Sequence, residues 1–481
     1  MIGRNLLRRH AGAGARPICL PARATLLGRA WLIVLVALPV LAALPAQAQS
    51  LVELYQFARG YDATYLGALA QHDAALARAA QARAGLLPTV GLSAGAAHTR
   101  QDVSAASANP ARALNARNVG INATQPIYRP ANRASFEQGK RQVGIAHALL
   151  HLAEQDLVVR VAQAYFDVLA SQDSVALVRA QKTAVAEQLA FARRNFQVGT
   201  STVTDAREAQ ARYDLVLAQE IAADNDLQVR KLMLDQLVGR PGSLPVPLSA
   251  PVVLGPLVPN DMAQLVAQAD AAHPSIEQAQ LELDVAALEV RKAQAGHLPT
   301  LDATLGYNIS DNPQGTTSAP ERSRIKAVSV GVVLNMPLFA GYATENRVRE
   351  SLALQEQSRA RLDGARRSVA QATRVAFLGL VSGVGQVKAL EAAEASSQVA
   401  LDANRISYRV GVRINIDVLN AQTQLFQTKR DLALARYGVL VGHLKMRQAN
   451  GTLAAEDLFA INAALATHGR PAVDSTAPAP H

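Results

Sequence analysis

The sequence has few of the residues that build disulfide or metal sites: its 481 residues include one cysteine and one tryptophan, and aromatic residues make up 4% of it. A single cysteine excludes a disulfide scaffold and a zinc or iron–sulfur site with several cysteine ligands. Nor does the chain contain a nucleotide-binding P-loop or an HExxH metalloprotease motif. His147 and His151 have a spacing that could share a metal, but a solvated helix face explains two histidines without a third ligand. We therefore expect no enzyme, no metal and no cofactor.

Acidic residues and lysine are absent from the first 48 residues, which carry six arginines. An apolar run over residues 31–44 follows and precedes the sequence Ala46-Gln47-Ala48. A basic start, a short apolar run and an A-x-A site are typical of a secretory signal peptide. The alternative, a membrane-spanning helix, needs about 20 apolar residues, and this run is shorter. We predict that residues 1–48 are removed on export.

Removal of this segment changes the charge of the chain. Without the six arginines the net charge falls from +10 to +4, and the only cysteine, Cys19, and the only tryptophan, Trp31, are lost as well. The basic charge therefore belongs mostly to the export signal, which leaves little support for binding to nucleic acid. Beyond residue 48 no stretch holds 18 consecutive apolar residues, so we expect no transmembrane helix in the mature chain.

The remaining chain repeats itself. Residues 85–89, GLLPT, return as residues 296–300, GHLPT, at an offset of 211. Further pairs follow in the same order, and near the end Gly239 matches Gly451 at an offset of 212. Many matches in one order along the chain indicate an internal duplication.

The duplication predicts the domain organisation. A first repeat covers residues 49–239 and a second covers 261–452. The segment 240–260 between them contains six prolines, which predicts an extended linker. We expect residues 453–481 to form a short helix and a disordered tail.

Each repeat contains two segments in which apolar and polar residues alternate with period two. They are residues 90–96 and 118–124 in the first repeat, and 301–310 and 327–334 in the second. Such alternation predicts strands. A soluble sandwich would need more strands, whereas strands of about ten residues with one fully apolar face suit a transmembrane barrel. Four strands cannot close a barrel, so copies must combine, and three copies would supply twelve strands.

Segments without proline and rich in alanine, glutamine, leucine and arginine accompany these strands. Apolar residues recur every three or four positions over residues 131–197, 203–237, 344–409 and 417–446, which predicts helices. A continuous helix of about 67 residues spans roughly 100 Å, a length typical of coiled-coil packing. A solid coiled coil without a pore is the alternative, and the strand pairs disfavour it.

The chain resembles the TolC family of bacterial outer-membrane export channels over essentially all of its mature length. The resemblance rests on the duplication, on the segment 408–420 (YRVGVRINIDVLN), on proline-containing strand-to-helix junctions and on Val-Gly turns. The residues concerned are the junction prolines Pro126 and Pro337 and the turn glycines Gly199 and Gly411. The resemblance implies an α+β membrane protein in the outer membrane of a Gram-negative bacterium. Four strands per chain would join a trimeric, twelve-stranded transmembrane β-barrel, and long coiled α-helices would form a periplasmic tunnel.

The resemblance also implies roles for residues near the Val-Gly turns. In the family a polar network there keeps the periplasmic entrance closed, and the matching residues are Thr204, Asp205, Tyr408 and Arg413. An aspartate can accept hydrogen bonds from a tyrosine hydroxyl and an arginine guanidinium on a neighbouring helix. Exposed links of this kind contribute about 1 kcal/mol or less each, so the binding of a partner could break the closure.

Asp417 matches the position at which the family has a ring of carboxylates facing the pore. Three copies would concentrate negative potential there and attract cations. The family's most familiar member has a second acid three residues later, but Asn420 occupies that position here. A single ring weakens the expectation of strong cation selectivity and of block by metal ions.

Channels of this family work with a periplasmic adaptor protein and an inner-membrane exporter, which is an ABC transporter or a proton-driven pump. They lie in outer-membrane lipid and pass polypeptides or small molecules outward. The segment 408–420 and the absence of a cysteine for lipidation at the start of the mature chain favour type I protein secretion, such as export of RTX-type toxins. The alternative is the outer-membrane component of a tripartite multidrug efflux pump. A soluble periplasmic coiled-coil adaptor is the third and less favoured class.

Overall fold

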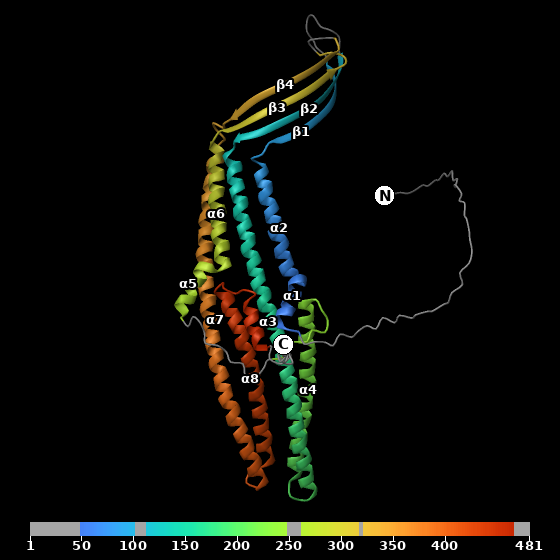
Figure 1. The fold of residues 1–481 in the computed structure, drawn as a ribbon, viewed down its shortest axis with the longest axis vertical. Coiled ribbons are helices and arrows are strands. Elements are labelled where there is room, and N and C mark those ends of the chain that lie inside the picture. Colours follow the sequence, from blue (N-terminus) through green and yellow to red (C-terminus); the bar gives the residue numbers. More distant parts are fainter. Residues whose placement is uncertain (1–48, 102–111, 248–260, 317–320, 466–481) are drawn as a thin grey trace, which may run out of the picture. The chain divides into compact units, whose positions relative to one another are not determined.

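The computed structural model describes residues 49–101, 112–247, 261–316 and 321–465, which all belong to one compact unit of the chain. The predicted signal peptide, most of the proline-rich linker and the C-terminal tail lie outside these residues. Within them, the chain forms a four-stranded sheet and a set of helices, two of which are much longer than the rest (Figure 1). This arrangement confirms the α+β fold predicted from the sequence.

The sheet combines the strand pairs of both repeats. The strands are β1 (Thr89–Gln101), β2 (Arg112–Tyr128), β3 (Thr300–Asn312) and β4 (Ser323–Asn335). Neighbouring strands are antiparallel in the order β1-β2-β3-β4, and β2 joins β3 with Ile121 opposite Tyr307. Within the described chain, β1 and β4 therefore each leave one edge unpaired.

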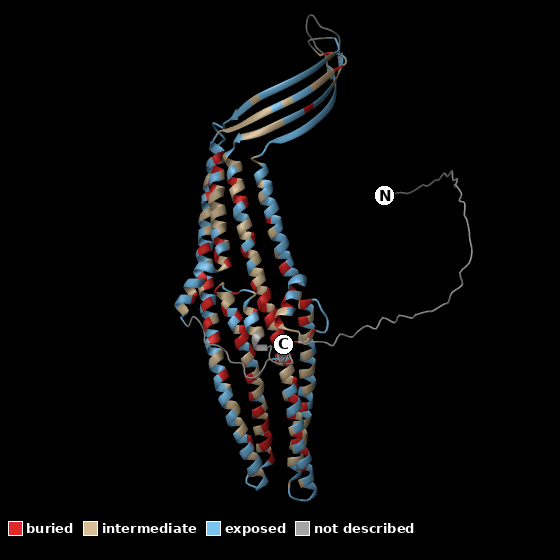
Figure 2. Cartoon of the chain, in the orientation of Figure 1, coloured by how far each residue is buried: buried red, intermediate tan, exposed pale blue. Residues whose placement is uncertain are grey.

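One face of the sheet is apolar along most of its length. The register places Leu92, Ile121, Tyr307 and Val328 side by side on successive strands, and the rows toward the helices are apolar in the same way. These side chains are exposed, and Val330 keeps 81% of its accessible surface. Figure 2 shows almost no buried residues in the sheet. An apolar face of this extent needs either a protein partner or lipid.

The opposite face is small and polar. A Cβ atom on Gly120 would lie 2.9 Å from Asn308 Oδ1, and one on Gly306 would lie 2.7 Å from Ser329 Oγ. The glycines therefore leave room for polar side chains from the neighbouring strands. Ser93 Oγ also donates a hydrogen bond to the carbonyl oxygen of Gly120 at 3.3 Å. This face can line an aqueous space.

Two helices of unusual length lead away from the sheet. α3 (Pro130–Gln197) follows β2 and has 68 residues, and α7 (Ala343–Arg409) follows β4 and has 67. Neither contains a proline beyond its first turn, so the backbone hydrogen bonds between successive turns are not interrupted. At 1.5 Å per residue each helix spans about 100 Å.

Each long helix has one shorter partner near the sheet and another farther from it. The partners are α2 (Ala63–Ala84) and α4 (Val203–Val238) on α3, and α6 (Pro274–Gln294) and α8 (Asn415–Ala449) on α7. Contacts of α3 with α6 and α8 join the two repeats. The lateral order is α7-α6-α3-α2 near the sheet and α7-α8-α3-α4 beyond it. The helices form a single layer with α7 at one edge and α2 and α4 at the other.

The remaining elements are α1 (Leu51–Tyr61), α5 (Met262–Ala272), the 3₁₀ turn η1 (Ala295–His297) and α9 (Asp457–Leu465).

The largest buried cluster lies where α1 and α9 pack on α3 and α8. In the cluster, the ring of Phe166 lies 5.5 Å from that of Tyr165 and 5.8 Å from that of Tyr437. The Tyr165 hydroxyl donates to the carbonyl oxygen of Val246 at 2.8 Å, and the Tyr437 hydroxyl donates to Asp173 at 2.6 Å. Burial raises the pKa of both hydroxyls, so both remain donors at neutral pH.

Candidate functional site

The residues predicted to form an entrance lie around two tight turns, where α3 passes into α4 and α7 passes into α8 (Figure 1). Gly199 and Gly411 each follow the end of a long helix with a φ angle of +78°, a left-handed conformation that favours glycine. The amide of Thr200 donates to the carbonyl oxygen of Asn195 at 2.9 Å, and in the second repeat the amide of Val412 donates five residues back at the same distance. The two repeats therefore end their long helices in the same way.

Asp205 is held by the turn that precedes α4. Its carboxylate accepts hydrogen bonds from Ser201 Oγ at 2.7 Å and from the amide and hydroxyl of Thr202 at 3.1 and 2.9 Å. Burial on its own would raise the pKa of Asp205, but the hydrogen bonds from Ser201 and Thr202 outweigh it and lower the pKa. The carboxylate is therefore ionised at neutral pH. Thr204, one residue earlier, is exposed in the first turn of α4.

Tyr408, near the end of α7, faces α3. Its ring packs edge-on against Phe191, with the ring centroids 5.9 Å apart. Burial raises the pKa of Tyr408 and the negative charge of Asp205 adds to the rise, although the neighbouring Asn195 opposes it. Tyr408 is thus close enough to Asp205 to feel its charge, but the Asp205 carboxylate bonds to Ser201 and Thr202 instead.

Arg413 pairs with a residue of its own repeat. Its Nη1 lies 3.5 Å from Asp417 Oδ2, four residues further along the chain. Asn420 accepts a hydrogen bond from Arg212 of α4 at 2.8 Å. Inside one chain the structure therefore brings Arg413 next to Asp417 and not next to Asp205. The links expected between Asp205, Tyr408 and Arg413 therefore remain predictions.

Sequence reasoning missed Asn415, a buried residue that joins the two turns. Its side chain is fully buried. Its Nδ2 donates to the carbonyl oxygen of Asp205 at 3.3 Å, and its Oδ1 accepts from Gln188 of α3. One turn later, Leu419 packs into a cluster with Leu189 of α3. An asparagine at the start of a helix ordinarily suggests a cap, so nothing in the sequence indicated this role.

The junction prolines lie where strands pass into the long helices. Pro126 is in β2 opposite Asp302, beside an irregularity in the register. Arg129, the residue before α3, makes two hydrogen bonds with Asp302, at 2.8 and 2.6 Å, and so ties the first-repeat helix to a second-repeat strand. Pro337 follows β4 in the irregular segment before α7, which also contains Tyr342 with a φ of +64°. These residues redirect the chain between sheet and helices.

Both edges of the helical layer expose apolar side chains. Ile221 and Leu232 of α4 keep 65% and 67% of their surface, and Val375 and Val399 of α7 keep 63% and 69%. By length and composition α7 also contains one 18-residue window apolar enough to cross a membrane, and 11% of that window is buried. A helix with an exposed row of apolar side chains passes the same test, while Phe377 and Leu380 of α7 pack with Leu432 of α8 in a buried cluster. The exposed apolar side chains on α4 and α7 therefore indicate that further protein packs against both edges of the helical layer.

Basic residues bound the apolar face of the sheet at the end away from the helices. Arg100, Arg117, Arg324 and Lys326 lie on the same face as Val330 by register, and all four are exposed. At about 3.3 Å per residue and a tilt of about 40°, the stretch from Leu334 to Arg324 covers about 25 Å of depth. This depth matches the apolar band of an outer-membrane barrel.

Two patterns with catalytic or metal-like spacing lie in ordinary structural settings. Residues 91–95 have the GxSxG spacing of hydrolase nucleophiles, which sequence reasoning missed, but they lie inside β1, whereas a nucleophile elbow needs a sharp strand-to-helix turn. The ring centroid of His147 lies 6.1 Å from that of His72 and 4.6 Å from that of His151, and the rings meet at angles of 57° and 60°. Among the described residues, no group of three potential ligands could hold a metal ion.

Comparison with known proteins gives consistent matches. A family model described as "Outer membrane efflux protein" matches residues 54–240 and 265–452. The outer membrane protein TolC of Vibrio cholerae serotype O1 is 31% identical over 418 residues, which cover 87% of this chain and 94% of that protein. The proteases secretion protein PrtF of Dickeya chrysanthemi is 29% identical over 429 residues, which cover 87% and 91%. A crystal structure of CusC has the same fold, with a TM-score of 0.74 at 17% identity over 84% of this chain and 92% of that chain.

Proposed function

Because the chain belongs to the outer membrane efflux protein family, and is thus an outer-membrane protein, we propose that its copies close into a channel with a helical tunnel. The unpaired edges of β1 and β4 carry this proposal. The apolar face of the sheet suits contact with lipid, and an open strand edge is not tolerated there. The two edges must therefore be paired. Each chain can offer its β4 edge to the β1 edge of the next and its α7 to the next α2 and α4. Head-to-tail contacts of this kind close into a ring.

We further propose that the ring contains three chains. Twelve strands result, an even number within the range of known outer-membrane barrels. In such a barrel the apolar face that carries Val330 contacts lipid, and the glycine-rich polar face lines the pore. The helices extend the pore as a tunnel on the periplasmic side.

In this proposal the turns between α3 and α4 and between α7 and α8 close the far end of the tunnel. In a ring, Thr204 and Asp205 of one repeat come near Tyr408 and Arg413 of another, and three copies of Asp417 face the axis. Because Arg413 lies beside Asp417, its positive charge offsets part of the negative potential of that ring. We propose that the entrance is held by these weak polar contacts and that a docking partner opens it.

The energy for transport comes from other proteins in this proposal. The sequence has no nucleotide-binding P-loop, so an inner-membrane exporter has to drive the cargo. A periplasmic adaptor would join that exporter to the turns at the end of the tunnel.

Protein export by type I secretion is the cargo route that we favour. The support is the similarity to a relative named as a proteases secretion protein over 87% of this chain. The family description itself names efflux, so export of small molecules is the second candidate. Residues of the barrel and tunnel do not encode which cargo passes.

The two routes can be separated in a bacterium that lacks its own channel of this family. The chain is expressed there either with an ABC protease exporter and its adaptor or with a proton-driven pump and its adaptor. Protease activity in the medium and the minimal inhibitory concentration of pump substrates are then measured. Secreted protease without restored drug resistance supports type I secretion, and restored resistance without secretion contradicts it.

A further inference from the structure

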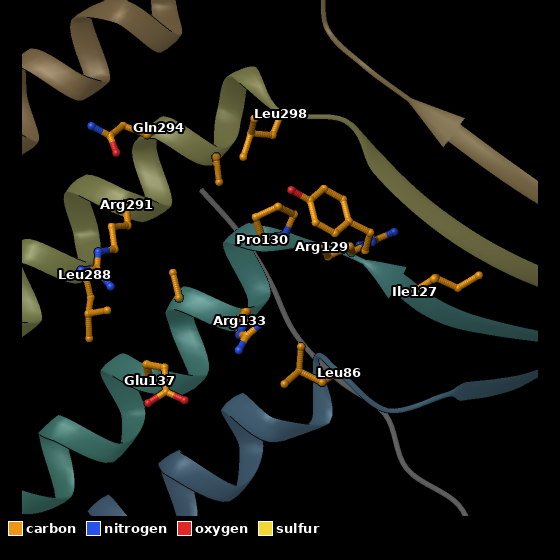
Figure 3. A pocket seen from close by; sticks show the side chains of 13 residues that line it. Leu86, Ile127, Arg129, Pro130, Arg133, Glu137, Leu288, Arg291, Gln294 and Leu298 are labelled. Atoms are coloured by element: carbon orange, nitrogen blue, oxygen red, sulfur yellow. The ribbon is translucent and has the colours of Figure 1, made fainter.

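A cavity of about 520 Å³ lies where the sheet meets the helices. Its walls come from the end of β2, the start of α3, the end of α6 and the turn before β1 (Figure 3). Leu86, Ile127 and Leu298 form apolar parts of the wall, and Arg133 and Arg291 supply positive charge from two neighbouring helices. The cavity therefore combines an apolar part with a cationic part.

The cavity lies on the apolar side of the sheet. Tyr128 lines it and is paired in register with Leu301, which belongs to the apolar face. Between Pro126 and Tyr128 the register shifts, so Ile127 is an additional residue in β2, and 57% of its surface is exposed. Leu298 is 42% exposed. The cavity thus sits at the helix end of the band that would contact lipid.

The positive charge at the cavity is not neutralised within the described part of the chain. Arg133 and Arg291 are exposed, and neither forms an ion pair there. The one carboxylate in the wall, Glu137, lies 3.0 Å from Lys140, which balances its charge. Arg129, the third arginine of the wall, is paired with Asp302 at 2.6 Å.

The start of α3 adds to this positive potential. Pro130 is the first residue of the helix and lines the cavity, and no side chain caps the helix start. The positive end of the helix dipole favours an anion at this point, although Pro130 has no amide hydrogen and the amides of Asn132 and Arg133 both donate to the carbonyl oxygen of Arg129. Two unpaired guanidinium groups beside an uncapped helix start are suited to bind a phosphate group.

We propose that this cavity binds an anionic phospholipid of the periplasm-facing leaflet. The lipid phosphate pairs with Arg133 and Arg291, and an acyl chain lies against Ile127 and Leu298. The volume is within the range of small-ligand sites and suits a headgroup with its glycerol unit. The orientation of the leaflet rests on the proposed channel, in which the helices extend into the periplasm. Such a lipid would fix the depth of the barrel at its inner boundary.

The test uses native mass spectrometry of the detergent-solubilised full assembly, titrated with phosphatidylglycerol, phosphatidylcholine or diacylglycerol. We expect the wild type to retain phosphatidylglycerol more strongly than the two other lipids. The double variant Arg133→Gln/Arg291→Gln should bind phosphatidylglycerol about tenfold more weakly, which corresponds to about 1.4 kcal/mol, because two exposed ion pairs with the phosphate are lost. The matched control Arg207→Gln/Arg361→Gln removes two exposed arginines of α4 and α7 that do not line the cavity, and it should behave as the wild type.

Equal retention of the three lipids by the wild type, or equal retention of phosphatidylglycerol by the wild type and the double variant, would overturn the lipid site. A loss of binding in the control of the same size as in the double variant would also overturn it. The same spectra report the number of chains. A wild type without a three-chain assembly contradicts the proposed channel, whereas a three-chain assembly without lipid preference contradicts the cavity alone.

Discussion

The guanidinium group of Arg413, in the turn before α8, lies 3.5 Å from the carboxylate of Asp417, in the first turn of that helix. The two side chains are 58% and 31% exposed, so water screens the pair and its strength is modest. The importance of the pair lies in its position. If three Asp417 residues face the axis of a channel, three Arg413 residues beside them determine how much of the negative charge a passing ion meets.

Substitution of Arg413 by serine should raise the cation preference of the channel. The change removes the positive charge beside Asp417, which increases the negative potential at the constriction. It should also raise the conductance, because Arg413 belongs to the predicted closure network. Reversal potentials and conductance in planar bilayers measure both effects. Arg409→Ser, on an exposed residue of the same region, is the matched control and should change neither.

Substitution of Asp417 by alanine should weaken the cation preference. The expected reason is the loss of the carboxylate ring, and the same reversal potentials measure it. Unchanged selectivity in Asp417→Ala would show that this side chain does not face the pore.

The entrance should open more readily in acid. Hydrogen bonds lower the pKa of Asp205 in the folded turn, so the folded turn binds its proton less readily than the unfolded chain does. The resulting stabilisation is fully present above the ordinary carboxyl pKa of about 3.9 and is lost as the pH falls through the lowered value. Protonation also removes the charge with which Asp205 would bind Tyr408 and Arg413 in the predicted closure, so we expect conductance to rise below about pH 4. Asp205→Asn accepts similar hydrogen bonds without titrating in this range, and an identical acid response in that variant would contradict the assignment.

Substitution of Asn415 by alanine should loosen the two turns from each other. The change leaves Gln188 and the carbonyl oxygen of Asp205 without a partner in a partly buried position, at a cost of about 1–3 kcal/mol. Uptake of a large fluorescent dye by cells should increase, and the assembly should dissociate at a lower temperature. Asn404→Ala removes an amide that bonds only within α7 and serves as the control. Similar behaviour of the two variants would argue against Asn415 as the link.

Substitution of Val330 by arginine should impair insertion into the membrane. Val330 lies near the middle of the apolar face, where an arginine in contact with lipid costs about 2–4 kcal/mol. Ser329→Arg places the same side chain on the polar face and should assemble close to normally. Heat-modifiable assembly in purified outer membranes measures the difference. Equal assembly of the two variants would show that the apolar face does not contact lipid.

Local patterns in the sequence were sufficient to predict most of the elements. Alternation over residues 301–310 predicted β3, which extends over Thr300–Asn312, and the proline-free segment 131–197 predicted α3, which extends over Pro130–Gln197. These patterns depend only on neighbours in the chain and on which face meets water or lipid. The order of the strands was not accessible in this way, because the pairing of β2 with β3 joins residues far apart in the sequence.

The candidate site was less accessible than the fold. The spacing of Arg413 and Asp417 is that of a helical ion pair, but the family resemblance directed Arg413 to Asp205 instead. The role of Asn415 depends on Gln188 of another helix, and no periodicity reports such a contact. The arginines of the cavity, Arg133 and Arg291, belong to different repeats and converge only through the packing of α3 against α6. Tertiary packing, which leaves no local signal, created each of these relationships.

The central claim, that three chains close edge to edge, can be tested by cross-linking β4 to the β1 of the next chain. The only cysteine precedes the expected cleavage site, so introduced cysteines would be unique in the mature protein. Leu92→Cys on β1 is combined in turn with Val328→Cys, Val330→Cys or Val332→Cys on β4, and oxidised outer membranes are analysed on denaturing gels. At least one pair should yield linked species of two and three chains and nothing larger, because the ring is closed. The absence of linked chains, a series that stops at two, or one that continues beyond three would contradict the claim.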